Sequence, residues 1–374
     1  MDTKLKYLIV FFAMCMTCMT AHPTIPMRGV VYDVGLKFGG KNLSVETFDS
    51  ARVAYDMDII RNILRCNTVR IEGESVERLS EAARIAHRQG LKVLFNPWKM
   101  EATPEETVSY MTEAAVSAEK LRKDGIDLTF VAGCEYTLFC KGAFPGDSFD
   151  ERMLFLSSLG RNPESAMEKI GEASGKLNKI LAAICKGVRK EFSGPVTYSS
   201  GTWENVDWDI FDIVGIDHYR GSESDSEYVG AIDRYRCGKP IIVMEFGCCA
   251  YKGASARGGA GFAIFQGVDS EGHAIYEGGV TPERSETEQA DYIERQLALL
   301  DGAGIEGACV YVFAYPIYPF VPGGIDYDMI SYALVKSFPA GDPHWDQIPA
   351  WIPKEAFFRL GSIYASMEER ERKP

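Results

Sequence analysis

The chain has 374 residues, of which 46% are hydrophobic and 25% charged, an ordinary composition for a soluble globular enzyme. Lys and Arg number 40 and Asp and Glu 53, so the formal net charge is −13. An acidic surface repels nucleic acids and anionic membranes, which argues against both as partners and suits a neutral substrate. Solubility is the simpler explanation for the charge. The length is sufficient for one large domain, since a full β/α barrel needs about 250 residues.

The first residues are typical of a secretory leader. Lys4 and Lys6 precede an apolar core from Leu8 to Met16, and small residues then lead to Ala21. That core is too short to span a bilayer. We therefore expect residues 1–21 to be a signal peptide, although Met19 stands where a small residue is usual. The remaining residues, 22–374, are expected to form one catalytic domain that is exported to the periplasm, the cell surface or the medium.

Ten cysteines are present, and two of them, Cys15 and Cys18, lie in the leader without a good lipoprotein box, so a lipid anchor is weakly supported. The other eight lack the regular spacing of a disulfide scaffold, and we expect most of them to be small buried hydrophobes. With five His and no His-x-His or His-x-x-x-His pair, we expect no metal and no cofactor. No later segment has the pattern of a transmembrane helix, and we expect a monomer. The eight cysteines are Cys66, Cys134, Cys140, Cys185, Cys237, Cys248, Cys249 and Cys309.

From Arg28 onward, short apolar runs alternate with longer segments of helical period. Near-continuous Val, Ile and Phe composition is what strands covered on both faces require. Eight such strands alternating with helices favour a parallel (β/α)8 barrel over an open doubly wound sheet. The predicted strands are Gly29–Tyr32, Thr68–Ile71, Lys92–Asn96, Leu128–Glu135, Val196–Ser200, Ile213–Asp217, Ile241–Glu245 and Gly307–Phe313.

Helix signals lie between these runs. Apolar residues recur at helical spacing from Ser75 to Gln89, and Gly90 stops that helix. The next helix opens at Thr103 with a cap, a proline in the first turn and two acidic residues at its positive end. Further predicted helices are Ala166–Phe192, Thr287–Ala303 and Pro353–Glu368.

Three connections are long. Cys140–Glu164 follows strand four and Cys248–Glu286 follows strand seven, so both leave the carboxyl ends of strands and are expected to wall a cleft. Ala314–Pro349 follows strand eight and is rich in aromatic residues. Those aromatics either stack on sugar rings or pack the loop itself.

Two of the strands end in a glutamate. Glu135 closes the run that begins at Leu128, and Glu245 closes the run that begins at Pro240. A carboxylate at the end of an apolar run is costly to bury unless it is used. Because the carboxyl ends of barrel strands meet at one mouth, we expect both groups in one cleft. Paired carboxyls across a cleft are the catalytic groups of a glycosidase.

Two further residues fit the environment that a carboxylate nucleophile needs. Arg70, at the end of strand two, is placed to hold Glu245 as an anion, and Tyr219, just after strand six, is placed to donate its hydroxyl to the same carboxylate. A structural ion pair for Arg70 and simple core packing for Tyr219 are the competing interpretations. Asp217 and His218 stand beside Tyr219, and one of them is expected to make a structural hydrogen bond inside the barrel.

These residues carry a family resemblance. The order Arg on strand two, Glu after strand four, Tyr after strand six and Glu on strand seven resembles clan A of the retaining glycoside hydrolases. The runs Phe130–Tyr136, Pro195–Tyr219 and Gly238–Gly247 are similar to corresponding strands of glycoside hydrolase family 113, whose members include β-mannanases. The likeness spans roughly residues 28–315 and implies Glu135 as acid/base and Glu245 as nucleophile. Beside them, the residues expected to contact the substrate are Arg70, Asn96, Trp98, Tyr136, Trp203, Tyr219, Phe313 and Tyr315.

Two departures from the family pattern concern the sugar site. Cys134 stands where clan members commonly have an Asn whose amide meets the sugar 2-hydroxyl, so an unusual sugar is one consequence. The tryptophan usual at strand eight is missing, with Phe313 or Tyr315 as the nearest substitutes. Mannan is therefore not secured as the substrate.

The prediction is an exported, cofactor-free retaining glycosidase that acts on a poly- or oligosaccharide through two glutamates. The first alternative is a barrel that binds glycan without cleaving it. The second is a metal-dependent amidohydrolase, which the scarcity of histidine disfavours. A third interpretation makes Glu135 and Glu245 salt-bridged structural groups.

Overall fold

The computed structural model describes residues 24–38, 42–160, 163–270, 273–323 and 326–372. Eight parallel strands close into a barrel in the order β1-β10-β7-β6-β5-β4-β3-β2, and β1 closes the ring because it pairs with both β2 and β10. All eight predicted strands are present, so the (β/α)8 barrel is confirmed. The barrel strands are β1 (Met27–Asp33), β2 (Thr68–Gly73), β3 (Lys92–Pro97), β4 (Leu128–Cys134), β5 (Val196–Gly201), β6 (Val214–Asp217), β7 (Ile241–Phe246) and β10 (Gly307–Val310).

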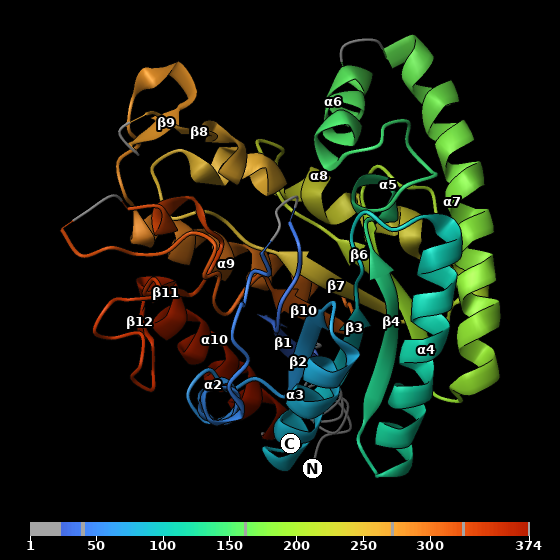
Figure 1. The fold of residues 1–374 in the computed structure, drawn as a ribbon, viewed down its shortest axis with the longest axis horizontal. Coiled ribbons are helices and arrows are strands. Elements are labelled where there is room, and N and C mark those ends of the chain that lie inside the picture. The colour runs from blue at the N-terminus through green and yellow to red at the C-terminus, as the bar shows by residue number, and fades with distance from the viewer. Residues whose placement is uncertain (1–23, 39–41, 161–162, 271–272, 324–325, 373–374) are drawn as a thin grey trace, which may run out of the picture.

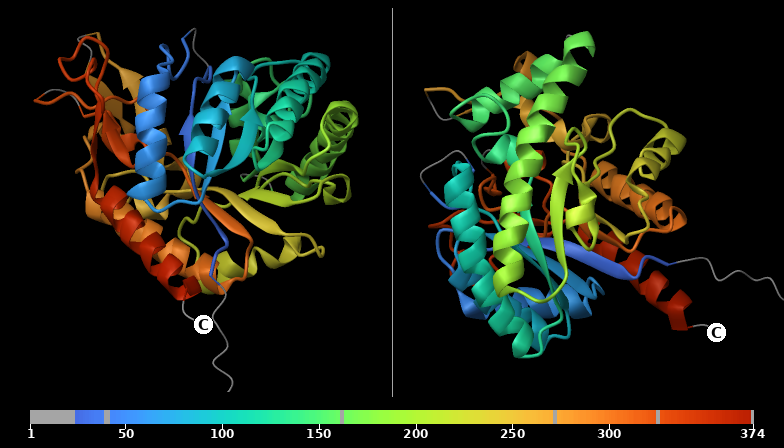
Figure 2. Two further views of the ribbon diagram at one scale, coloured as in Figure 1. Left: turned by 90° about the horizontal axis from the view of Figure 1, so that it is seen from below. Right: turned by 90° about the vertical axis from the view of Figure 1, so that its right-hand side faces the viewer.

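Helices cover the outside of the ring, and α3, α4 and α7 pack side by side against the strands (Figures 1 and 2). The cap and acidic first turn at Thr103 form a complete capping box at the start of α4. Helix α2 is absent from the predicted helices, although its buried residues Val53, Met57 and Ile60 recur at helical spacing. The helices are α2 (Ser50–Asn62), α3 (Val76–Arg88), α4 (Pro104–Lys123), α5 (Tyr136–Phe139), α6 (Phe149–Leu159), α7 (Pro163–Glu191), α8 (Asp225–Gly230), α9 (Glu286–Gly302) and α10 (Glu355–Arg372).

The connections after β4 and β7 rise in the upper part of Figure 1, where α6 and the hairpin β8–β9 are labelled, and the hairpin β11–β12 of the third connection lies at the left beside α10. The connection after β4 was expected to be a loop but carries the short helix α5 and the separate helix α6. The connection after β7 contains 3-10 turns and the hairpin β8–β9 (Phe265–Val268 and Ala274–Tyr276). The connection after β10 ends in the hairpin β11–β12 (Val335–Ser337 and Trp351–Pro353).

A buried ion-pair cluster fixes two of these connections to each other. Asp328, in the connection after β10, accepts Arg284 Nη2 at 2.9 Å and Lys354 Nζ at 2.9 Å. Arg284 precedes α9, and its Nη1 also lies 2.6 Å from Asp326 Oδ2. Burial lowers the pKa of Lys354, while Asp328 opposes that shift. One carboxylate between two cations therefore holds the segments that border the mouth of the barrel.

Seven of the eight cysteines after the leader are buried, and all eight are free thiols, as expected for most of them; Cys237 alone is exposed. In the part of the chain that the structure describes, no helix combines the length and apolarity that crossing a bilayer takes. The predicted leader, residues 1–21, lies outside the described residues.

Candidate active site

A cleft of about 750 Å³ opens at the carboxyl end of the barrel. Glu135 and Glu245 both line it, so the two strand-ending glutamates face one cavity. Its walls come from the long connections: α6 on one side, the 3-10 turns after β7 on another, and the aromatic segment after β10. Lining aromatic residues are Phe38, Trp98, Phe139, Phe149, Trp203, Tyr219, Phe262, Tyr311, Tyr315, Tyr318 and Tyr332.

The carboxylate of Glu245 is held from two sides. Arg70 Nη1 lies 2.7 Å from Oε1, and the Tyr219 hydroxyl donates to Oε2 at 2.9 Å. Arg70 is fully buried and comes from β2, which is separated from β7 in the ring by β1 and β10. A cation and a donor on the two oxygens favour the ionised carboxylate, which is the state a nucleophile requires.

Arg70 is itself fixed by neighbours on three strands. Its Nε donates to Asn96 Oδ1 at 2.9 Å, and its Nη1 also donates to the Met244 carbonyl at 3.2 Å. Nη2 lies 3.3 Å from Glu72 Oε2, and Glu72 is as fully buried as Arg70. Burial raises the pKa of Glu72 well above its usual range, and Glu245 raises it further. Because the neutral form of Glu72 is favoured, the charge of Arg70 remains directed at Glu245.

Glu135 stands at a strained turn directly after β4. Its φ is 43° and its ψ 49°, left-handed values that are uncommon outside glycine. Its amide donates to Ser199 O at 2.9 Å, and its carbonyl accepts from Leu138 N and Phe139 N at 2.9 and 3.1 Å. This backbone conformation points the half-buried side chain into the cleft instead of along the strand.

Hydrogen bonds behind Glu135 hold that turn. Glu204 accepts from both the amide and the hydroxyl of Thr137, at 3.0 and 2.7 Å. The Tyr198 hydroxyl accepts from Tyr136 N at 2.7 Å and donates to Glu204 Oε2 at 3.0 Å. Trp203 Nε1 donates to the Thr137 hydroxyl at 2.9 Å. The strained conformation is thus fixed by surrounding contacts, as strain at a functional site requires.

The two glutamates sit in opposite electrostatic environments. Burial raises the pKa of Glu135 well above its usual range, and the nearby carboxyls of Asp217 and Glu245 raise it further. The pKa of Asp217 is also raised, first by burial and then by Glu245. Glu135 has no hydrogen bond to a cation among the described residues, whereas Glu245 has Arg70. Glu135 therefore faces other carboxyls, whereas Glu245 faces a cation.

Cys134 places a thiol beside the ionised group. Its Sγ donates to Glu245 Oε1 and to Asp217 Oδ2, each at 3.5 Å, and burial raises its pKa well above the usual range. Asp217 also accepts the Ser199 hydroxyl at 2.6 Å. The neutral thiol is a weak donor, so this position gives a substrate hydroxyl much less than an amide would.

Six of the predicted site residues line the cleft. The side chain of Trp98 is 2% exposed, and its Nε1 has no hydrogen-bond partner among the described residues. The six are Glu135, Glu245, Trp98, Trp203, Tyr219 and Tyr315.

Four predicted contacts do not reach the cleft. Arg70 bonds to Glu245, and Asn96 accepts a hydrogen bond from Arg70 Nε; neither side chain lines the cleft. Tyr136 is buried beneath the turn, where its ring packs on Tyr198 at 5.6 Å. Phe313 is fully buried and packs edge-on against Trp351 at 5.4 Å. The expectation that Asn96, Tyr136 and Phe313 line the sugar site is therefore wrong.

Three residues that matter here are missing from the predicted set. Tyr311, and not Phe313, lines the cleft after β10, because the strand ends at Val310 and the chain turns there. Glu72 was available from the sequence: it stands two residues after Arg70 in β2 and therefore faces the same side. Met153 lines the cleft from α6, inside a segment that was expected to be loop.

No protein-family model and no curated protein matches the sequence. Solved structures match its fold. A glycoside hydrolase family 113 β-1,4-mannanase aligns with a TM-score of 0.55 at 16% identity, over 91% of this chain and 99% of that one. The family 113 β-mannanase of Alicyclobacillus acidocaldarius in complex with ManMIm gives 0.55 at 16% identity, over 92% and 98%.

The fold is that of the family 113 barrel. The β-glucuronidase of Parabacteroides merdae also aligns, with a TM-score of 0.52 at 11% identity, over 90% of this chain and 38% of that one. The same eight-stranded architecture thus occurs in glycoside hydrolases named for different sugars. At these identities the likeness establishes the fold, and the chemistry must be argued from the side chains.

The barrel also brings three possible metal ligands together. Donor atoms of Cys134, Asp217 and Glu245 lie within 4.8 Å of one another. The Arg70 guanidinium already neutralises this group at 2.7 Å from Glu245, and an ion bound there would face that positive charge. We assign no metal to this position.

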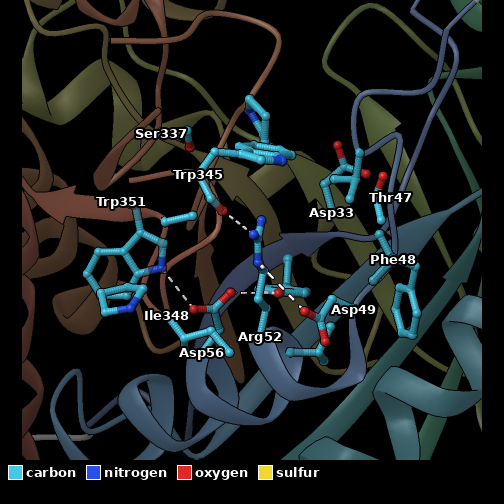
Figure 3. Close-up of a pocket in the computed structure, with 18 residues that line it drawn as sticks. Asp33, Thr47, Phe48, Asp49, Arg52, Asp56, Ser337, Trp345, Ile348 and Trp351 are labelled. Atoms are coloured by element: carbon cyan, nitrogen blue, oxygen red, sulfur yellow. Dashed lines mark hydrogen bonds and ion pairs between the residues drawn. The ribbon is translucent and has the colours of Figure 1, made fainter. Parts of the chain in front are cut away.

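A smaller pocket of about 90 Å³ lies beside the barrel, between α2 and the segment that leads to β12 (Figure 3). Asp56 accepts from Tyr32 Oη at 2.7 Å and from Trp351 Nε1 at 2.8 Å. The Arg52 guanidinium stacks on Trp345, 4.8 Å from the ring centre, and donates to its carbonyl. These contacts join α2 to the last connection, which is a structural role.

Proposed function

We propose that this chain is a retaining glycoside hydrolase that cleaves the glycosidic bonds of a carbohydrate by double displacement. One observation carries the proposal: within one cleft, Glu245 is held as an anion by Arg70 and Tyr219, while the pKa of Glu135 is raised. A nucleophile and an acid are what retention requires. The likeness of the fold to family 113 barrels supports the same chemistry.

In the first step, a carboxylate oxygen of Glu245 attacks the anomeric carbon and the bond to the leaving oxygen breaks. Glu135 gives its proton to that oxygen, so the leaving group departs as a neutral alcohol. In the second step, the ionised Glu135 takes a proton from water, and the water oxygen displaces Glu245 from the anomeric carbon. The protein ends in its starting state, with no cofactor consumed.

Substrate orientation is assigned to the cleft aromatics. Tyr311, Tyr315 and Trp203 offer faces on which sugar rings stack. We propose mannosides as the first substrates to test, because the aligned family 113 structures are β-mannanases. Cys134, in place of a stronger donor, makes gluco and other series necessary in the same screen.

The test is a screen of polysaccharides and aryl glycosides, followed by Glu135→Ala and Glu245→Ala. Glu245→Ala should abolish turnover of every substrate. Glu135→Ala should abolish cleavage of alkyl and sugar leaving groups but spare much of the first step on dinitrophenyl glycosides, whose leaving group needs no proton. A 2-deoxy-2-fluoro glycoside should label Glu245, as detected by peptide mass spectrometry. Binding without cleavage, or near-normal turnover in either variant, would contradict the proposal.

The pH profile gives a second test. Catalysis requires Glu135 protonated in the free enzyme, so kcat/KM should fall as pH rises through its elevated pKa. Glu135→Ala, measured on a dinitrophenyl glycoside, should lack that alkaline limb. If Glu135→Ala kept the same fall in kcat/KM at high pH, that fall would be due to the ionisation of a group other than Glu135.

Export, a single catalytic domain over residues 22–374 and a monomeric state belong to the same proposal. The mass of the protein recovered from the producing cells should correspond to loss of residues 1–21. Light scattering should give the mass of one chain. Retention of the leader, or a stable dimer, would overturn the respective part.

A further inference from the structure

Helix α6 presents an apolar stripe to the cleft. Phe149, Met153 and Leu156 all line the cavity, at spacings of four and three residues that bring them to one helix face. Each is partly exposed. Leu138 and Phe139 of α5 continue the stripe toward Glu135, and Phe139 stacks on Phe149 at 5.1 Å. We call these five residues the α6 wall.

The α6 wall also takes part in packing α6 onto the protein, because its residues lie with Phe155 on a small apolar cluster of Leu138, Phe144 and Ala173. Phe155, on another side of the helix, packs against Phe144 at 4.9 Å. Arg152 is fully buried, donates from Nε to Leu138 O at 2.5 Å, and pairs through Nη2 with Glu101 at 2.8 Å. Leu154 points away and is 71% exposed. Phe155 and Arg152 add to this packing, while Phe149, Met153 and Leu156 stay partly exposed and line the cleft.

The wall adjoins the proton donor. Helix α5 begins with the residue after Glu135, and the amides of Leu138 and Phe139 bond to the Glu135 carbonyl. In a retaining glycosidase the acid protonates the leaving oxygen, so the leaving group lies beside the acid and the retained sugar beside the nucleophile. The α6 wall therefore belongs to the leaving-group side.

The wall offers no partner for sugar hydroxyls. Its five side chains are hydrocarbon or thioether, and hydroxyls buried against them would lose their hydrogen bonds to water. Of the carboxylates nearby, Glu101 is already bound to Arg152 and to Phe149 N at 2.9 Å, and Asp150 is exposed at the rim. An apolar leaving group would displace water from this surface without such a loss.

We propose that the chain cleaves glycosides whose leaving group is an apolar alcohol, with an alkyl chain or hydrocarbon ring system lying on the α6 wall. This inference rests on the proposed glycosidase function and narrows its substrate class. It predicts that recognition on the leaving-group side comes from apolar contact, whereas the sugar is oriented by polar groups around Glu245.

The test compares n-octyl and methyl β-glycosides, in the manno and gluco series, with β-1,4-linked oligosaccharides of the same sugars. We expect kcat/KM for the octyl glycoside to exceed that for the methyl glycoside by at least about tenfold, since even one buried methylene discriminates by that order. The kcat/KM for the octyl glycoside should also be higher than the kcat/KM for the oligosaccharide of the same sugar. Equal values for octyl and methyl, or a preferred oligosaccharide, would overturn the inference and leave the glycosidase function standing.

Variants locate the effect on the wall. The double variant Met153→Ser, Leu156→Ser should lower the octyl-to-methyl ratio of kcat/KM at least about tenfold. Leu154→Ser makes the same kind of change on the exposed face of the same helix and should leave the ratio as it was. Thermal unfolding checks that all variants fold. A ratio unaffected by the double variant overturns the inference. Absence of any hydrolysis, together with no labelling of Glu245, overturns the glycosidase function itself.

Discussion

Arg70 Nη1 lies 2.7 Å from Glu245 Oε1, although the two residues come from β2 and β7 on different parts of the ring. The contact crosses the barrel interior, where both side chains are buried. Asn96 and Glu72 surround the guanidinium from β3 and β2. Buried side chains in the barrel interior thus place a cation against the Glu245 carboxylate at the mouth of the barrel.

Replacing this arginine should lower activity without removing the charge. Arg70→Lys keeps one cation but cannot bond Glu245 and Asn96 together, since an ammonium lacks the planar fork. We expect kcat/KM to fall about 10–100-fold, the equivalent of a lost charge-assisted hydrogen bond. Arg122→Lys is the control, because Arg122 also makes two bonds to a carboxylate, that of Glu119, but far from the cleft. Activity of Arg70→Lys within twofold of wild type would show that the pair is structural.

The Tyr219 hydroxyl can be tested by a single-atom change. Tyr219→Phe removes the 2.9 Å donor to Glu245 Oε2 while keeping the ring in the cleft wall. We expect kcat/KM to fall about 10-fold or more, with little change in the thermal midpoint. Tyr110→Phe removes a hydroxyl that donates to Glu74 O at 2.7 Å, away from the cleft, and measures the general effect of such a loss. Steady-state kinetics on an aryl glycoside measures kcat/KM for both variants. If Tyr219→Phe and Tyr110→Phe lowered kcat/KM equally, the Tyr219 hydroxyl would have no specific role.

The turn that carries Glu135 should depend on the glycine before it. Gly133 has a φ of 101°, and a Cβ there would lie 2.2 Å from Tyr136 Cζ. Gly133→Ala should therefore cost about 3 kcal/mol or more of unfolding free energy and most of the activity. Gly125→Ala has a similar φ of 91° with nothing within 4 Å, so it should cost only the backbone strain of about 1–2 kcal/mol. Denaturant unfolding measures the loss of unfolding free energy in both variants. Similar losses in Gly133→Ala and Gly125→Ala would mean that the Tyr136 ring can move away from the added Cβ at little cost.

Asp33 should make stability depend on pH. Burial raises its pKa from 3.8 to about 6, so the folded state binds this proton more tightly than the unfolded state. The contribution of Asp33 to the free energy of unfolding is fully present below about pH 4, and it is lost as the pH rises to about 6. Asp33→Asn keeps the acceptor for Gly35 N, and its stability relative to wild type should therefore rise by up to about 3 kcal/mol between pH 4 and 7. Denaturant titrations at several pH values test this, with Asp127→Asn as the control for loss of one charge. If the stability difference between Asp33→Asn and wild type were the same at every pH, the predicted role of Asp33 would be refuted.

Much of this arrangement could be predicted from the sequence, because it depends on strand ends. Strands buried on both faces can be recognised in the sequence as apolar runs. The carboxyl ends of the parallel strands of a barrel all lie at the same end of that barrel. That reasoning placed Glu135 and Glu245 in one cleft. It also placed Tyr219 and Arg70 at the ends of their strands, within reach of Glu245.

The failures come from backbone details that the sequence does not state. Tyr136 was expected at the substrate, but the left-handed φ of Glu135 sends the two neighbouring side chains in different directions, and such a φ in a glutamate has no sequence signal. Asn96 was misplaced because the register of β3 against β2, which pairs it with Glu72, is a tertiary fact. Phe313 was misplaced because β10 ends three residues earlier than expected.

Arg152 has a consequence for how this enzyme class could change its substrates. The same guanidinium bonds Leu138 O in the turn that follows Glu135 and Gly146 O before α6, so it joins the two segments. Exchange of α6 for another sequence should therefore shift Glu135, the proposed proton donor, unless an arginine were kept there. Selectivity and rate are mechanically linked at this residue, and an engineer who alters one should expect the other to follow.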